Sequence, residues 1–149
     1  MTLCIVDMQP YFTSSDRIVC SVIREIERAK RNGSGIVVLE FVDCGSTYRE
    51  IVDAIKDYDR KTFTKKSDDD GSGEFIGAAK RAGFSTNYIT VVGVNRAYCV
   101  AYTVAGLMNN RKVKKIRVVE DATWGHEPEE EMKELWRLSK HPCGKVRIV

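Results

Sequence analysis

The chain has 149 residues, of which 43% are hydrophobic and 30% charged, and its formal net charge is +3. This length suits one domain with a single core, and this composition argues against a disordered chain. The Lys and Arg residues are mixed with acidic ones, so no basic run favours a nucleic-acid partner. No signal peptide and no stretch long and apolar enough to cross a bilayer is visible, so we expect a cytoplasmic protein without a membrane partner.

Residue types that commonly bind metals are present without metal-ligand spacing. The five cysteines are odd in number and include no CxxC pair, which is typical of free thiols in a reducing compartment. The two histidines, His126 and His141, have no ligand spacing to each other. We therefore expect neither a metal nor a cofactor. The cysteines are Cys4, Cys20, Cys44, Cys99 and Cys143.

Short apolar runs alternate with amphipathic stretches along the whole chain. The runs are too compact for helices and predict strands. Capping residues, glycines and helical spacing of apolar residues predict the helices between them. In chain order we expect strand 3–6, a helix through 18–29 that is capped by residues 14–16 and stopped at 32–33, strand 36–39, a helix through 51–55, strand 61–65, a helix through 75–79, strand 88–92, helix 97–108, strand 116–119, helix 129–138 and strand 146–149.

Alternating strands and helices predict an α/β fold. Strands that are apolar throughout are typical of a parallel sheet covered on both faces, so we expect one domain over 1–149 with a doubly wound, Rossmann-like, mostly parallel sheet of about six strands. Such sheets bind ligands beyond the carboxyl ends of their strands. The residues there are Asp7, the segments 40–44, 65–66, 93–99 and 121–125.

Cys99 is the candidate nucleophile at this edge. It falls in the first turn of a predicted helix, where backbone N–H groups and the helix dipole favour a thiolate and are expected to lower the pKa of the thiol. The same N–H groups are suited to an oxyanion. The alternative is a small buried cysteine that begins a core helix.

An acid and a cation follow two other strands at the same edge. Asp7 ends a wholly apolar strand, either as a cap for a neighbouring loop or as a general base. Lys65 or Lys66 ends the third strand, either as a surface lysine or as electrostatic support for a thiolate. Together with Cys99 these side chains supply a base, a cation and a nucleophile.

Three segments carry a resemblance to a known family. They are Cys-Ile-Val-Asp-Met-Gln-Pro-Tyr-Phe at 4–12, Val-Val-Gly-Val-Asn-Arg-Ala-Tyr-Cys-Val at 91–100 and Val-Val-Glu-Asp-Ala at 118–122. In order and spacing the chain resembles the isochorismatase-like cysteine hydrolases, which include the nicotinamidases. The segment around Cys99 is the most specific of the three.

The resemblance implies a catalytic triad of Asp7, Lys65 and Cys99 and a thioester intermediate. Lys65 is preferred over Lys66 because an apolar residue two places earlier, here Phe63, precedes the family's lysine. The resemblance also implies a cis peptide between Val94 and Asn95, and an oxyanion hole formed by the N–H groups of Asn95 and Cys99.

The resemblance further implies a small-molecule substrate with an amide-type C–N bond, because family members that cleave isochorismate lack the cysteine. We expect Glu40 and Tyr98 to contact this substrate. Nicotinamidases of the family bind a metal through an Asp and two His residues, whereas the matching segment 40–47 contains no histidine. Family members often form dimers or tetramers, so a homo-oligomer is expected, with Trp124 or Trp136 as candidate contacts.

Two other functions stay open. The first is a non-catalytic binding module of the same fold, because the segment 65–71 departs from the family pattern. The second is a nucleotide-binding protein of the flavodoxin or Rossmann type. The second is disfavoured, since no glycine-rich phosphate-binding pattern follows the first strand.

Overall fold

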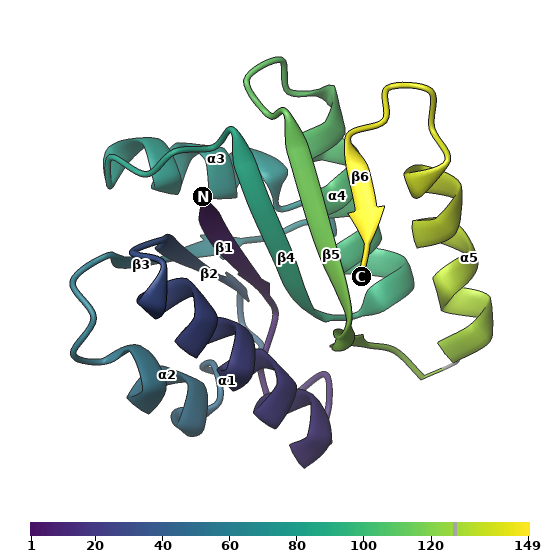
Figure 1. The fold of residues 1–149 in the computed structure, drawn as a ribbon. Coiled ribbons are helices and arrows are strands. Elements are labelled where there is room, and N and C mark those ends of the chain that lie inside the picture. Colours follow the sequence, from purple (N-terminus) through teal and green to yellow (C-terminus); the bar gives the residue numbers. More distant parts are fainter. Residues whose placement is uncertain (127) are drawn as a thin grey trace.

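The computed structural model describes residues 1–126 and 128–149 and is built on one parallel sheet of six strands (Figure 1). The strand order is β3-β2-β1-β4-β5-β6, so the chain reverses direction across the sheet after β3. This architecture confirms the predicted doubly wound α/β fold. The strands are β1 (Thr2–Val6), β2 (Gly35–Phe41), β3 (Lys61–Lys66), β4 (Tyr88–Val94), β5 (Lys115–Trp124) and β6 (Val146–Ile148).

Helices cover both faces of the sheet, two on one side and three on the other (Figure 1). The first side carries α1 (Asp16–Arg31) and α2 (Arg49–Ile55), and the second carries α3 (Ser72–Arg81), α4 (Ala101–Asn109) and α5 (Pro128–Ser139). A short π-helix, η1 (Arg96–Val100), joins β4 to α4.

The two faces of β1 supply two separate cores. Leu3 and Ile5 pack with α1 and α2, while Cys4 and Val6 pack with α3, α4 and α5. All five residues of β1 are buried, as expected for a strand covered on both sides. The strand is therefore rigidly held, and the residue that follows it is placed with little freedom.

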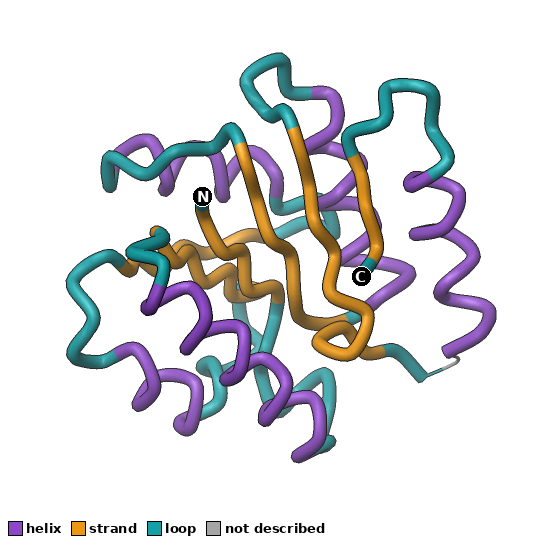
Figure 2. Tube along the Cα trace, viewed as in Figure 1, coloured by secondary structure: helices purple, strands orange, loops and turns teal. Residues whose placement is uncertain are grey.

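The end of β5 differs from the prediction. A strand was expected only to Val119, but strand structure continues to Trp124 after an irregularity, because Val91 pairs with Val118 while Gly93 pairs with Thr123. Figure 2 shows the strand folding into a small loop there. The Arg96 guanidinium stabilises this loop: it donates to Thr123 Oγ1 at 3.1 Å and to the backbone oxygens of Glu120 and Thr123.

The helix expected from residue 97 begins instead as the π-helix η1. The N–H of Val100 donates to the carbonyl of Asn95, five residues earlier, at 3.0 Å. Cys99 lies inside this wider turn, and α4 begins two residues later at Ala101. Short π segments occur frequently at functional sites.

Three exposed aromatic residues come from η1, α4 and α5: Tyr98, Tyr102 and Trp136. Trp124 is instead packed against the core of α1 and α2. The expected homo-oligomer remains a prediction. Within the described part of the chain, no helix is long and apolar enough to span a membrane.

Candidate active site

Asp7 follows β1 directly and has a left-handed backbone with φ of 48°. Aspartate adopts this conformation more readily than most residues. The N–H of Asp7 donates to the carbonyl of Leu39 at 3.0 Å, which fixes the turn against β2. On the other side, Gly93 approaches so closely that a Cβ atom would lie 2.1 Å from the Val6 oxygen. The carboxylate is fully buried at the carboxyl edge of the sheet.

Lys66, and not Lys65, is the lysine that reaches Asp7. The Lys66 ammonium lies 2.8 Å from Oδ2 of Asp7, and both side chains are completely buried. Lys65 is 59% exposed and pairs with Glu40 at 3.3 Å. Successive residues of a strand point to opposite faces, so only one of the two lysines faces Asp7. The structure therefore contradicts the expected position of Lys65 and brings Lys66 to the site.

Several contacts hold the Lys66 side chain. Its ammonium donates to the carbonyl of Asp68 at 2.8 Å and lies 4.4 Å from the centre of the Phe41 ring. Gly71 leaves room for the stem, since a Cβ atom there would lie 2.7 Å from Cδ of Lys66. A buried cation with an ion pair, a carbonyl and an aromatic face is compensated for the loss of water.

The Cys99 thiol lies between two carboxylates. Cys99 is 3% exposed and its thiol donates to Oδ1 of Asp69 at 3.5 Å. Apart from the Lys66 ion pair, neither oxygen of Asp7 accepts a hydrogen bond from the described residues in this arrangement. Asp7 is nevertheless near enough to interact with the thiol, and this interaction lowers the pKa of Asp7 while raising that of Cys99.

The thiol is protonated at rest, because burial raises the pKa of Cys99 to about 12. The negative charges of Asp7 and Asp69 act in the same direction, and Lys66 opposes them. The prediction of a lowered thiol pKa was therefore wrong. Burial also raises the pKa of Asp7 above its ordinary value, although contacts with Cys99 and Lys66 oppose that rise. An acceptor for the thiol proton is thus required beside the sulfur.

The loop between β3 and α3 places Asp69 over the sulfur. The Thr103 hydroxyl accepts from the N–H of Gly71 at 3.0 Å and donates to the carbonyl of Asp69 at 3.4 Å. Gly106 of α4 lets the loop approach, since a Cβ atom there would lie 2.6 Å from the Asp70 carboxylate. The loop is therefore fixed to α4 by two hydrogen bonds and by close packing.

The expected cis peptide joins Val94 to Asn95. It lies between β4 and η1, four residues before Cys99. The side-chain oxygen of Asn95 is buried and accepts no hydrogen bond from the described residues.

The two expected substrate contacts are not part of the buried cluster. Glu40 accepts from the N–H of Thr47 at 3.2 Å and pairs with Lys65, so both of its contacts are structural. Tyr98 is 57% exposed beside Cys99.

Two residues that shape the site, Gln9 and Asp69, had no predicted role. Gln9 is fully buried. Its side-chain NH2 group donates to the backbone carbonyls of Phe41 and Gly45, and its side-chain oxygen accepts from the N–H of Phe41. These bonds hold the loop after β2. The signal for Gln9 was a polar residue directly after a buried strand. Asp69 carried only the weaker signal of a departure from the family pattern.

A metal site finds no support in the donor set. Among residues 1–126 and 128–149, no group of three His, Cys, Asp or Glu side chains could hold an ion. The segment matching the nicotinamidase metal ligands contains no histidine, so these residues do not fit that metal.

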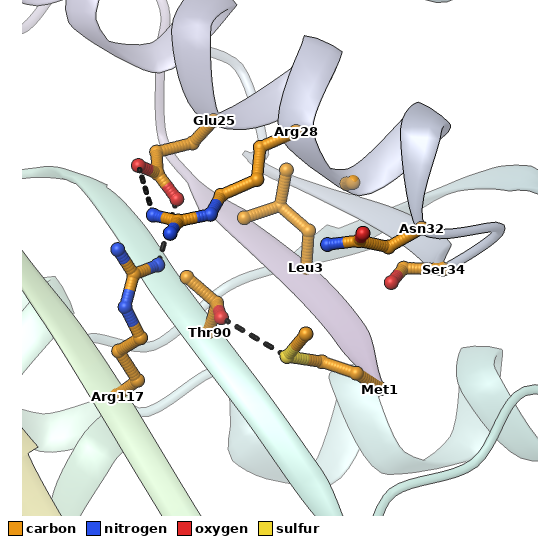
Figure 3. A pocket seen from close by; sticks show the side chains of 9 residues that line it. Met1, Leu3, Glu25, Arg28, Asn32, Ser34, Thr90 and Arg117 are labelled. Atoms are coloured by element: carbon orange, nitrogen blue, oxygen red, sulfur yellow. Dashed lines mark hydrogen bonds and ion pairs between the residues drawn. The ribbon is translucent and has the colours of Figure 1, made fainter.

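Two cavities away from these residues are lined by no cysteine. One of about 230 Å³ lies at the amino end of the strands, where Glu25 pairs with Arg117 at 2.7 Å and with Arg28 at 3.6 Å (Figure 3). Another, of about 470 Å³, lies beside Arg96 and the end of β5. The chemistry is therefore concentrated in the buried cluster of Asp7, Lys66, Asp69 and Cys99, which we call the thiol cluster.

Comparison with solved structures agrees with the fold. The structure of the pyrazinamidase/nicotinamidase from Streptococcus mutans UA159 superposes with a TM-score of 0.80 at 16% identity, covering 99% of both chains. The nicotinamidase SaPncA from Staphylococcus aureus gives a TM-score of 0.77 at 20% identity, covering 98% of this chain and 97% of that one.

The octameric hydrolase YcaC from Escherichia coli gives a TM-score of 0.78 at 16% identity, over 99% of this chain and 74% of that one. By sequence alone, no curated protein is a significant match. The model of the isochorismatase domain matches residues 1–147. The chain therefore belongs to the isochorismatase family.

Proposed function

We propose that this chain is a cysteine hydrolase that cleaves an amide-type C–N bond of a small molecule through a thioester on Cys99. The observation that carries the proposal is the fully buried ion pair of Asp7 and Lys66 beside a buried thiol. A buried ion pair costs desolvation energy and seldom stabilises a fold more than apolar residues would. Strongly perturbed titratable groups of this kind are typical of active sites.

The first half of the reaction forms the acyl-enzyme. Asp7 takes the thiol proton while the sulfur of Cys99 attacks the carbonyl carbon, which gives a tetrahedral intermediate. The N–H groups of Asn95 and Cys99 would bind its oxyanion. Asp7 then returns the proton to the leaving nitrogen, the C–N bond breaks, and the amine departs.

The second half releases the acid. Asp7, ionised again, takes a proton from water, whose oxygen attacks the thioester carbon. The C–S bond breaks, the sulfur recovers the proton, and the carboxylic acid leaves. Lys66 keeps Asp7 ionised before each proton transfer and stabilises the thiolate electrostatically. Lys66 thus replaces Lys65 in the proposed triad.

A screen of small primary amides tests the proposal. The purified protein should release ammonia and the carboxylic acid in equal amounts from at least one of them. A chain that binds amides, as seen by a rise in melting temperature, but releases no ammonia across a broad panel would be a binding module instead.

The pH profile tests the role of Asp7. A base must be ionised, so kcat/KM should fall about tenfold per pH unit on the acid side of its pKa. Because burial raises the pKa of Asp7, the midpoint of this fall should lie above the ordinary value of 3.8. The measurement is kcat/KM between pH 4 and 8, with tryptophan fluorescence as a control for unfolding. Constant activity over this whole range would contradict the assignment.

A further inference from the structure

We propose that Asp69 selects substrates carrying a positively charged nitrogen group close to the scissile amide. The proposal rests on the proposed function, since it takes Cys99 as the nucleophile. Its starting observation is the contact of 3.5 Å between Oδ1 of Asp69 and the sulfur of Cys99. A carboxylate at this distance from the attacking atom also lies beside any group attached to the carbonyl under attack.

The charges of the thiol cluster favour a cation. Asp7 and Asp69 contribute two carboxylates, Lys66 contributes one ammonium, and the thiol of Cys99 is neutral. The Lys66 ammonium is already engaged by Asp7 and by the carbonyl of Asp68. One negative charge is therefore left uncompensated within the cluster, and it lies on Asp69. An anionic substrate group would be repelled at this position.

Asp69 is half-buried, and its backbone is held in place by α4. The hydrogen bonds from the loop to Thr103 fix its carbonyl and the following Gly71. A carboxylate that is fixed and partly removed from water binds a cation more strongly than a mobile surface carboxylate does.

The same contact links substrate charge to activation of the thiol. In the free enzyme the thiol donates to Asp69 at 3.5 Å and also interacts with Asp7. A cationic group that binds Asp69 would occupy the first acceptor, which leaves Asp7, the proposed base, as the acceptor of the thiol proton.

Charged thiol reagents test this selectivity without any turnover. The probes are two methanethiosulfonates of similar size, one with a trimethylammonium group and one with a sulfonate group. Peptide mass spectrometry measures the rate of disulfide formation at Cys99, and each rate is divided by the rate with N-acetylcysteine. For the wild type, the ratio of the cationic to the anionic rate should be about 10 or more, since the Asp69 carboxylate attracts the trimethylammonium charge and repels the sulfonate charge in a partly desolvated site.

Asp69→Asn should lower this ratio to about 3 or less, because it removes the charge and keeps the shape. Asp68→Asn is the matched control: it removes the same charge from an exposed neighbour and should leave the ratio within about twofold of the wild type. Asp69→Ala serves as a second variant in case the amide side chain disturbs the loop.

Three results would overturn the proposal: a wild-type ratio near 1, an equal loss in the Asp68 and Asp69 variants, or no labelling of Cys99 by either reagent. The last result would show that ligands do not reach Asp69 and the sulfur together. Selective labelling in a protein that hydrolyses no amide would refute the proposed function and would leave only a preference of the Cys99 site for cationic ligands. Amide hydrolysis without charge selectivity would refute this inference alone.

Discussion

Lys66→Met is expected to destabilise the protein by about 3–5 kcal/mol and to abolish its activity, because it leaves the Asp7 carboxylate buried without its counter-charge. Without the ammonium, Asp7 would be protonated at neutral pH and could not accept the thiol proton. Urea unfolding gives the change in the free energy of unfolding, and kcat/KM gives the change in activity.

Lys65→Met is the matched control at the adjacent position. Its ammonium is exposed and pairs with Glu40 at the surface, so the free energy of unfolding should change by less than about 1 kcal/mol. Activity should stay within about twofold of the wild type. Similar effects of the two substitutions, or a larger effect of Lys65→Met, would contradict the placement of Lys66 in the triad.

Cys99→Ala should lower kcat/KM for a hydrolysed amide by about 10³-fold or more, since it removes the nucleophile. The fold should persist, because the change removes only one buried sulfur atom and should lower the free energy of unfolding by about 1 kcal/mol. Activity comes from the release of ammonia, and stability comes from thermal unfolding.

Cys44→Ala controls for the loss of a thiol. Cys44 is partly exposed and lies just after β2, at the same edge of the sheet. Its activity should equal that of the wild type. Hydrolysis that survives Cys99→Ala, or that is lost equally in the Cys44 variant, would reject Cys99 as the nucleophile.

The fold was predictable because each strand has a plain apolar signature. β1, β2 and β4 are buried on both faces, so burial demands an uninterrupted apolar run, and such runs are visible in the sequence. The bulge in β5 was not predictable, because it depends on contacts with Arg96 from another element.

Lys65 was preferred to Lys66 as the partner of Asp7 because a strand end alone does not tell which of two adjacent residues faces inward. The register pairs Lys65 with Glu40 and Lys66 with Phe41, and a shift of one residue exchanges the faces. Phe63 misled the alignment: it is 41% exposed at the sheet edge rather than buried beside the lysine.

The pKa of the Cys99 thiol was mispredicted because the prediction considered the helix terminus but not burial or the nearby carboxylates. Burial and the carboxylate of Asp7 raise the pKa of Cys99 more strongly than Lys66 lowers it, and Asp69 adds a smaller rise. Asp69 is near Cys99 only through the packing of the β3–α3 loop on α4, and the sequence separates these residues by 30 positions. Contacts of this kind depend on the tertiary structure.

Intact mass spectrometry of the enzyme, quenched in acid during turnover of an amide, is the decisive test for a thioester on Cys99. We expect a mass increase equal to the acyl part of the substrate, located on the peptide that contains Cys99 and removed by hydroxylamine. An enzyme that turns over the amide at full rate without any acyl adduct under single-turnover conditions, or with the adduct on another residue, would contradict it.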